Sequence, residues 1–297
     1  MGYTSYSTES RDIRAKASGF ETKLRDEIFT QNIKRRIHES MSPKNFKIRE
    51  ARDSDEHSTT LPVILALDLT GSMGHIPHSL IRDGLPKLMS NIIQHGFNDA
   101  ALLFLGIGDH ECDRYPLQVG QFESGDEELD MWLTRTYIEG GGGGNHGESY
   151  LLAWYLAAFH TETDSFQKRG KKGVLITTGD EPGLNTIPEN ALREIFGDNG
   201  QYQTYSDVEL LKIVSEKWEV YHILIDGRSR SYDSNSYWNQ LLGDRCIKIY
   251  DHEDLPNKVS ELVVKHSKDN VLSTNKISDD SINEPQSNEN DGKEEIL

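Results

Sequence analysis

Long apolar runs that alternate with segments of helical period are the feature that most limits the folds open to this chain. The runs are continuous rather than alternating, so both faces of each predicted strand should be covered by helices. Strands that alternate with helices in this way are typical of a parallel sheet. Four runs have this character: residues 61–69, 100–109, 173–183 and 220–227.

Two shorter segments complete the predicted sheet. Residues 115–122 alternate in character and indicate an edge strand, and residues 246–251 form a short apolar strand. Between the strands, residues 75–96 have a helical period, with Pro86 inside the helix, where it should cause a kink. We therefore predict an α/β fold: a doubly wound, mostly parallel six-stranded sheet with helices on both faces.

The composition divides the chain into three parts. Residues 1–60 are polar and mixed in charge, and we expect an arm and linker, with one helix over 21–41, that drapes over the domain or binds a partner. Residues 61–266 hold the apolar runs and form the α/β domain. Residues 267–297 are polar and acidic, which predicts a disordered tail.

The charge of the chain limits its partners and its location. A formal net charge of −17 repels phosphate backbones and anionic lipid, so neither nucleic acid nor a membrane is expected as a partner. No run reaches membrane-spanning length, and the first residues lack the apolar stretch of a secretory signal. We expect a cytoplasmic protein in which Cys112 and Cys246 stay reduced.

Oxygen-bearing side chains gather where the predicted strands end. In an open parallel sheet, ligands bind beyond the carboxyl ends of the strands. Hard oxygen donors suit Mg²⁺, Mn²⁺ or Ca²⁺. The first run ends on Asp68, Thr70 and Ser72, spaced two apart on a turn that Gly71 permits, and Asp180 approaches from the third run. The other residues expected at this edge are Asp109, His110, Glu111, Asp113, Asn145, Glu148, Ser149, Thr177, Thr178, Glu181 and Asp226.

The sequence Asp68-Leu-Thr-Gly-Ser72 resembles the Asp-x-Ser/Thr-x-Ser motif of the von Willebrand factor A (vWA) family. In that family the motif ends the first strand and forms the metal-ion-dependent adhesion site (MIDAS). The third-strand aspartate of the family corresponds to Asp180 in Thr-Thr-Gly-Asp-Glu. The order of elements is also similar, including an antiparallel edge strand after the second strand. The resemblance covers roughly residues 60–266 and is that of a bacterial, intracellular member.

One position departs from the family pattern. A Thr usually lies in the loop before the helix that precedes the third-strand aspartate, and here that loop is Gly-rich and contains Asn145. The resemblance then implies Asp68, Thr70, Ser72, Asn145 and Asp180 as metal ligands, directly or through water. It leaves His75, Asp109 and Glu148 as neighbours that support the ligands.

The resemblance implies a binding module rather than an enzyme. Its Mg²⁺ or Mn²⁺ would keep an open position for an Asp or Glu of a protein partner. Bacterial members of the family are often paired with AAA+ ATPases, which makes such a system a candidate partner.

Several other interpretations of these residues remain open. Asp68 and Ser72 could be ordinary cap and turn residues, and amides of the glycine loop could bind an anion. The histidines lack close pairs, apart from His75 and His78, so zinc is not expected. The turn also resembles Asp-Lys-Thr-Gly-Thr of the haloacid dehalogenase superfamily, in which Asp68 would be the nucleophile of a Mg²⁺-dependent phosphotransferase. Against this, Thr70 stands where that superfamily has a second Asp, and Lys171 and Lys172 are at the wrong end of a strand.

Overall fold

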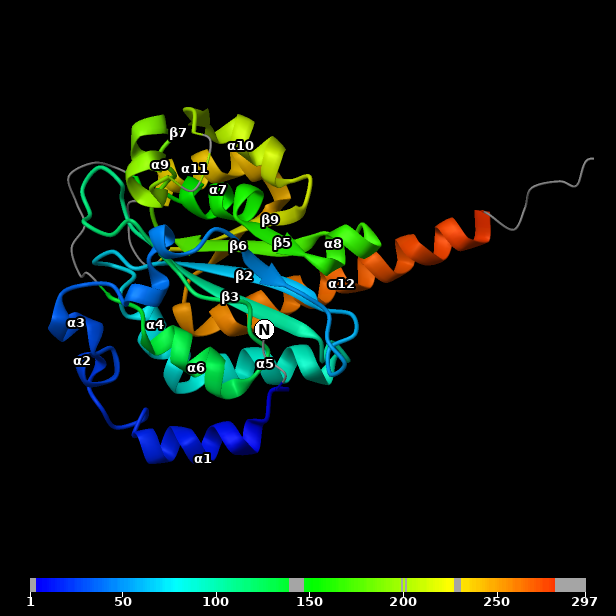
Figure 1. The fold of residues 1–297 in the computed structure, drawn as a ribbon, viewed down its shortest axis with the longest axis horizontal. Coiled ribbons are helices and arrows are strands. Elements are labelled where there is room, and N and C mark those ends of the chain that lie inside the picture. The colour runs from blue at the N-terminus through cyan, green and yellow to red at the C-terminus, as the bar shows by residue number, and fades with distance from the viewer. Residues whose placement is uncertain (1–3, 139–146, 199, 201, 227–230, 281–297) are drawn as a thin grey trace, which may run out of the picture.

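A single open sheet with helices on both faces forms the body of the protein (Figure 1). The computed structural model describes residues 4–138, 147–198, 200, 202–226 and 231–280, with backbone only for 231–232 and 269–280. Within these residues the central sheet has six strands. In spatial order they are β10 (Cys246–Ile249), β9 (Trp218–Ile225), β6 (Gly173–Gly179), β2 (Leu61–Asp68), β3 (Ala100–Ile107) and β4 (Leu117–Val119).

The neighbouring strands are parallel except at one edge. β2 lies between β3 and β6, and only β4 runs antiparallel to its neighbour, β3. β2 comes first along the chain but lies inside the sheet, so the chain adds strands on both sides of it. The predicted doubly wound, mostly parallel sheet and its antiparallel edge strand are confirmed.

The two faces of the sheet bury separate apolar cores. Alternate residues of β2 contribute to each: Ile64 and Ala66 to one, Leu65 and Leu67 to the other. Both sets are almost fully buried, which explains why the run is continuously apolar. The first core is covered by α7 (Leu151–Phe159), α9 (Glu189–Phe196), α10 (Asp207–Val214) and α11 (Ser231–Leu242). The second is covered by α4 (Ile76–Ser79), α5 (Leu85–Gln94), α6 (Asp126–Thr134) and α12 (Leu255–Asp280).

The helix predicted over residues 75–96 is divided before its proline. Five residues of π-helix, Leu80–Gly84, separate α4 from α5, and Pro86 lies in the first turn of α5. The Leu85 amide donates to the Leu80 carbonyl, five residues back. Proline has no amide hydrogen to donate, so a wider turn at this point accommodates it.

The N-terminal arm differs from the single helix predicted over 21–41, which is wrong. The longest helix in the described part of the arm is α1 (Thr8–Ser18), which is capped by Ser7 at its start and by Gly19 at its end. The predicted stretch holds only the short α2 (Arg25–Ile28) and α3 (Gln31–Lys34), since Arg35 adopts a left-handed conformation that ends α3. Short 3-10 turns at Glu39–Met41 and Pro43–Asn45 follow.

The arm packs against the domain at both of its ends. Arg11 of α1 is buried and pairs with Asp130 of α6 at 3.3 Å. Near residue 50, β1 (Arg49–Ala51) pairs in parallel with β5 (Thr161–Thr163), and Asp53 pairs with Arg169 of α8 (Asp164–Arg169) at 2.6 Å. Of the two expectations for the arm, the one in which it drapes over the domain agrees with these contacts.

The closing helix extends past the predicted start of the disordered tail. α12 continues to Asp280, so the boundary expected at residue 267 is wrong for the first part of the tail. Ser267 is buried, and its hydroxyl donates to the Val263 carbonyl, while His266 is bonded to the Lys172 carbonyl. These contacts continue the packing of the helix. Residues 281–297 lie outside the described residues.

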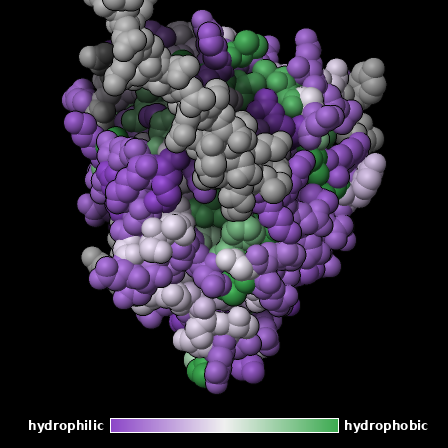
Figure 2. Space-filling model, turned by 90° about the vertical axis from the view of Figure 1, so that its right-hand side faces the viewer, coloured by the Kyte–Doolittle hydropathy of each residue, from purple (hydrophilic) through white to green (hydrophobic). Residues whose placement is uncertain are grey.

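Smaller elements and the surface complete the description. A two-stranded antiparallel ribbon joins β7 (Thr186–Ile187) to β8 (Tyr205–Ser206), and 3-10 turns occur at Gly243–Arg245 and His252–Asp254. Most of the surface on the face seen in Figure 2 is hydrophilic, as expected from the net charge. In the described part of the chain, no helix combines the length and the apolar character needed to span a bilayer.

Candidate metal site

Asp68, the last residue of β2, is fully buried and accepts hydrogen bonds on both carboxylate oxygens. Its Oδ1 accepts from the Thr70 amide at 2.9 Å and from the Thr70 hydroxyl at 2.6 Å. The turn that brings Thr70 back over Asp68 is closed by the Thr70 carbonyl, which accepts from the Met73 and Gly74 amides. The two-residue spacing of the motif therefore places the Thr70 hydroxyl beside the Asp68 carboxylate at the end of β2.

Ser72 and Asp180 form the exposed part of the same site. The Ser72 hydroxyl donates to Asp180 Oδ1 at 3.0 Å, although 108 residues separate them. Asp180 follows β6, which lies beside β2 in parallel register, with Leu67 opposite Thr178. Asp68 is 0% exposed and Thr70 5%, whereas Ser72 is exposed. The site thus has a buried floor and a rim that solvent reaches.

Tyr150, at the start of α7, contacts the buried side of Asp68. Its hydroxyl donates to Asp68 Oδ2 at 2.9 Å, and its pKa is raised well above the usual value because it is buried. A Cβ added at Gly179 would lie 1.8 Å from the Tyr150 hydroxyl and 2.8 Å from Asp68 Oδ2. Glycine at this position therefore allows the three groups to approach. Tyr150 was not among the residues predicted at the site, because in the sequence it opens an apolar helix.

Negative charge is crowded around Asp68. Burial raises the pKa of Asp68 and the Asp180 charge acts in the same direction, while hydrogen bonds from Thr70 and Tyr150 oppose the rise. Burial also raises the pKa of Glu148, and the charges of Asp68 and Asp113 add to this effect. A cation beside these groups would favour their charged forms.

Two further carboxylates are buried near the site with an unused oxygen. Among the described residues, Glu148 Oε2 and Asp109 Oδ2 have no hydrogen-bond partner, although the two residues are only 6% and 3% exposed. Asp109 Oδ1 accepts from the Glu111 amide at 2.9 Å. Buried polar atoms are normally paired, so these two oxygens need a partner that protein atoms do not supply.

Three other predicted residues, Asn145, His75 and Asp226, have different outcomes. Asn145 lies outside the described residues. His75 makes an edge-on ring contact with His252, with centroids 4.4 Å apart. Asp226, expected at this edge, pairs with Lys248 of β10 instead.

The positions of the lysines do not support the phosphotransferase hypothesis. Lys171 and Lys172 precede β6 and so lie at the amino ends of the parallel strands, opposite to Asp68.

The oxygen atoms gathered at this edge belong to carboxylates and hydroxyls. Within the described ranges, no three His, Cys, Asp or Glu side chains are close enough to hold a metal by themselves. Asp68 and Asp180 supply two carboxylates, and Thr70 and Ser72 supply two hydroxyls. Hard divalent cations such as Mg²⁺ accept donors of this kind and keep several waters.

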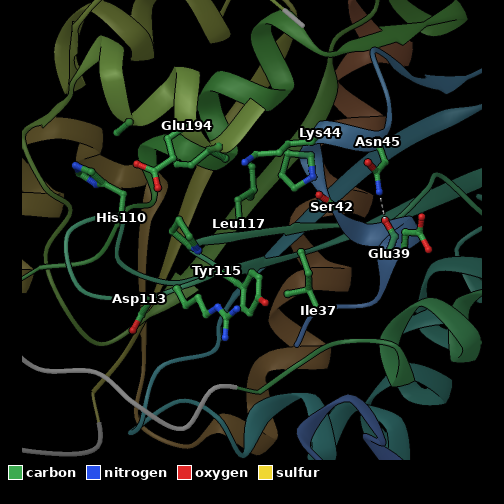
Figure 3. A pocket seen from close by; sticks show the side chains of 15 residues that line it. Ile37, Glu39, Ser42, Lys44, Asn45, His110, Asp113, Tyr115, Leu117 and Glu194 are labelled. Carbon is green, nitrogen blue, oxygen red and sulfur yellow. Dashed lines mark hydrogen bonds between the residues drawn. The ribbon is translucent and has the colours of Figure 1, made fainter. Parts of the chain in front are cut away.

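A cavity of about 400 Å³ adjoins the loop that follows β3 (Figure 3). The N-terminal arm forms one wall through Ile37 and Lys44, and Tyr115 and Glu194 belong to other walls. The cavity includes His110, whose Nδ1 lies 2.7 Å from the Ser149 hydroxyl, but none of the four donors. It is therefore a neighbour of the site and not the site itself.

Solved structures with a similar fold include three proteins of different origin. The pilus adhesin SpaC of Lactobacillus rhamnosus GG, in its open conformation, is 13% identical with a TM-score of 0.46, over 72% of this chain and 31% of that one. Proximal thread matrix protein 1 of the mussel byssus, with a zinc-occupied MIDAS motif, is 12% identical with a TM-score of 0.45, over 74% and 49%. BatB of Bacteroides thetaiotaomicron is 14% identical with a TM-score of 0.42, over 70% and 99%.

These similarities are distant. The chain spans about a third of the adhesin and about half of the matrix protein. No family model and no curated protein matches the sequence. The resemblance to the vWA family therefore rests on this chain's own fold and motif: the Asp-x-Thr-x-Ser turn ends β2, and Asp180 follows β6 beside it.

Proposed function

We propose that this protein is a vWA-type binding module that uses one Mg²⁺ or Mn²⁺ ion to engage a carboxylate of a protein partner. The hydrogen bond between Ser72 and Asp180 carries the proposal, because it joins the two halves of the motif across neighbouring strands. Asp68, Thr70, Ser72 and Asp180 would hold the ion, directly or through water. When bound, the ion supplies positive charge at a rim that solvent reaches.

The residues present fit such an ion. Asp68 and Asp180 offset its charge, and the buried Asp68 is held in one orientation by Thr70 and Tyr150. Hydrogen bonding of this kind around a ligand is usual in metal sites. Glu148 is hydrogen-bonded to Thr70 and has an unused oxygen. We therefore assign Glu148 as a further ligand of the ion, in addition to the Asn145 that the resemblance implies.

The partner is proposed from the same chemistry. Two carboxylates balance the formal charge of a divalent ion, but a coordination position left open to solvent makes the ion a Lewis acid that can bind a carboxylate oxygen of an acidic side chain. The rest of the surface is strongly acidic, so the ion would be a local exception on a protein of net charge −17. An acidic partner should therefore bind only when the ion is present. The AAA+ system suggested by the resemblance, and a cytoplasmic setting, remain proposals.

Titration calorimetry with Mn²⁺ and Mg²⁺ tests the proposal. We expect one ion per chain, and more than about 100-fold weaker binding for Asp68→Ala, since outer partners of metal ligands alone are worth 10–100-fold. Asp226→Asn is the matched control, because Asp226 follows a neighbouring strand but pairs with Lys248. It should bind the ion like the native protein.

A parallel assay of phosphate-ester hydrolysis separates the two functional classes. Ion binding without turnover agrees with a binding module. Turnover that Asp68→Ala abolishes would contradict it and support the phosphotransferase. Equal ion binding by the native protein and Asp68→Ala would also overturn the proposal, because the ion would then lie elsewhere.

A further inference from the structure

Helix α11 holds the backbone that carries Asp180. The Ser234 hydroxyl donates to the Asp180 carbonyl at 2.9 Å, and Trp238 Nε1 donates to the Glu181 carbonyl at 3.1 Å. Ser234 and Trp238 are four residues apart and so lie on one face of the helix. They are 1% and 0% exposed, so both hydrogen bonds are shielded from water.

The same tryptophan also contacts the residues behind Asp68. Its ring stacks on His222 at 3.7 Å with an interplanar angle of 8°, and it meets Tyr150 edge-on at 5.3 Å. Tyr150 in turn donates to Asp68 Oδ2. Trp238 therefore contacts the supports of both aspartates, one through a hydrogen bond and the other through ring packing.

We propose that Ser234 and Trp238 are positioning residues of the metal site, and that ion binding is coupled to the seating of α11 against the Asp180 turn. This inference rests on the proposed function. A carboxylate that must meet an ion within a few tenths of an ångström depends on the backbone that carries it. Fixing the carbonyls of residues 180 and 181 fixes that backbone. Because such coupling is reciprocal, ion binding should in turn stabilise α11.

Trp154 provides a matched control within the same aromatic cluster. Its ring meets Trp238 edge-on at 6.2 Å, and it is equally buried. Within the described part of the chain, its Nε1 has no hydrogen-bond partner. Trp154→Phe and Trp238→Phe therefore remove the same atoms from one core, but only Trp238→Phe removes a bond to the Asp180 turn.

The test compares Mn²⁺ affinity and thermal unfolding for the native protein, Ser234→Ala, Trp238→Phe and Trp154→Phe. We expect about two- to tenfold weaker Mn²⁺ binding for Ser234→Ala and Trp238→Phe, the range that one hydrogen bond contributes. Trp154→Phe should lower the melting temperature through the same loss of ring atoms and leave the affinity unchanged. Hydrogen exchange of the α11 amides should slow when Mn²⁺ is added to the native protein.

Three outcomes would count against the inference. Native Mn²⁺ affinity in all three variants would overturn the positioning role and leave the metal site intact. Equal loss in Trp154→Phe and Trp238→Phe would mean that core packing alone is responsible. Absence of Mn²⁺ binding in the native protein would overturn both this inference and the proposed function. If Trp238→Phe does not fold, Ser234→Ala decides, because it removes a single hydroxyl.

Discussion

Ser72 Oγ lies 3.0 Å from Asp180 Oδ1, and this contact joins the turn after β2 to the turn after β6. The two strands are adjacent and parallel, so their carboxyl ends meet at one edge of the sheet. Beneath the contact, Asp68 is held by Thr70 and Tyr150.

Gly179→Ala should damage both the stability of the protein and the metal site. A methyl group at this position would overlap the Tyr150 hydroxyl, at 1.8 Å, and displace it from Asp68. We expect a loss of about 1–3 kcal/mol in the free energy of unfolding, the usual cost of overpacking. Urea unfolding measures the loss. Tyr150→Phe in the same chain removes the overlapping oxygen, so the double variant should be less destabilised than the sum of the single ones. Strict additivity would contradict the proposed overlap.

Arg11→Ala should separate the arm from the domain. Arg11 and Asp130 form an ion pair whose side chains are 2% and 5% exposed. Asp130 keeps Arg14 as a partner at 2.9 Å, so the variant loses one buried charged hydrogen bond, and we expect a loss of about 1.5–3 kcal/mol. The exposed pair of Arg25 and Asp26, at 44% and 56%, gives the control. Arg25→Ala should change stability by less than about 0.5 kcal/mol. Similar effects of the two variants in chemical denaturation would show that the arm is not held at Arg11.

Stability near the second end of the arm should fall in strong acid. Burial acts to raise the pKa of Asp164, but hydrogen bonds from Lys168, the Asp53 amide and Arg52 lower it from 3.8 to about 2. A carboxyl whose pKa is lower in the folded state contributes stability above its unfolded pKa and loses it as the pH falls through the folded pKa. The contribution is therefore complete above about pH 4 and lost towards pH 2. Asp164→Asn should be less stable than the native protein at about pH 5, and the difference should narrow in acid. A difference that stays constant with pH would contradict this assignment.

Ser267→Ala should destabilise the protein slightly and locally. The Ser267 hydroxyl donates to the Val263 carbonyl inside α12, and the side chain is buried. We expect a loss of about 0.5–1.5 kcal/mol, as for one hydrogen bond. In Ser267→Ala, hydrogen exchange should be faster than in the native protein at the start of the extended part of α12 and unchanged in β2. An unchanged exchange pattern would support the disordered boundary that the sequence suggested at this residue.

Local patterns were enough to predict the sheet and half of the site. The apolar run of residues 61–69 predicted a strand covered on both faces, and its burial agrees. The Asp68 motif and Asp180 were predicted to meet because parallel strands end at one edge. This prediction depends on β2 and β6 being adjacent, which local patterns do not require, because β3 and β4 lie between them along the chain.

The remaining features depend on contacts between distant segments. In the sequence Tyr150 opens an apolar helix, and the packing of α7 against β3 and β6 directs its hydroxyl to Asp68. The Trp238 bond to the Glu181 carbonyl requires the exact seat of α11, which no periodicity specifies. In the arm, few apolar residues mark the helices, and α1 is held by the buried Arg11 and the half-buried Arg14 rather than by an apolar stripe. Charge patterns of this kind predict a solvated surface more readily than a packed one.

The central claim is that Asp68 and Asp180 hold the same ion, and a double-mutant cycle on Mn²⁺ affinity tests it most directly. Binding would be measured for the native protein, Asp68→Ala, Asp180→Ala and the double variant, with Asp226→Asn as the control. If one ion contacts both carboxylates, each single variant should lose most of the affinity and the double variant should lose little more. If Asp68→Ala and Asp180→Ala each keep native affinity, or remove separate ions with additive effects, the two residues do not form one metal site.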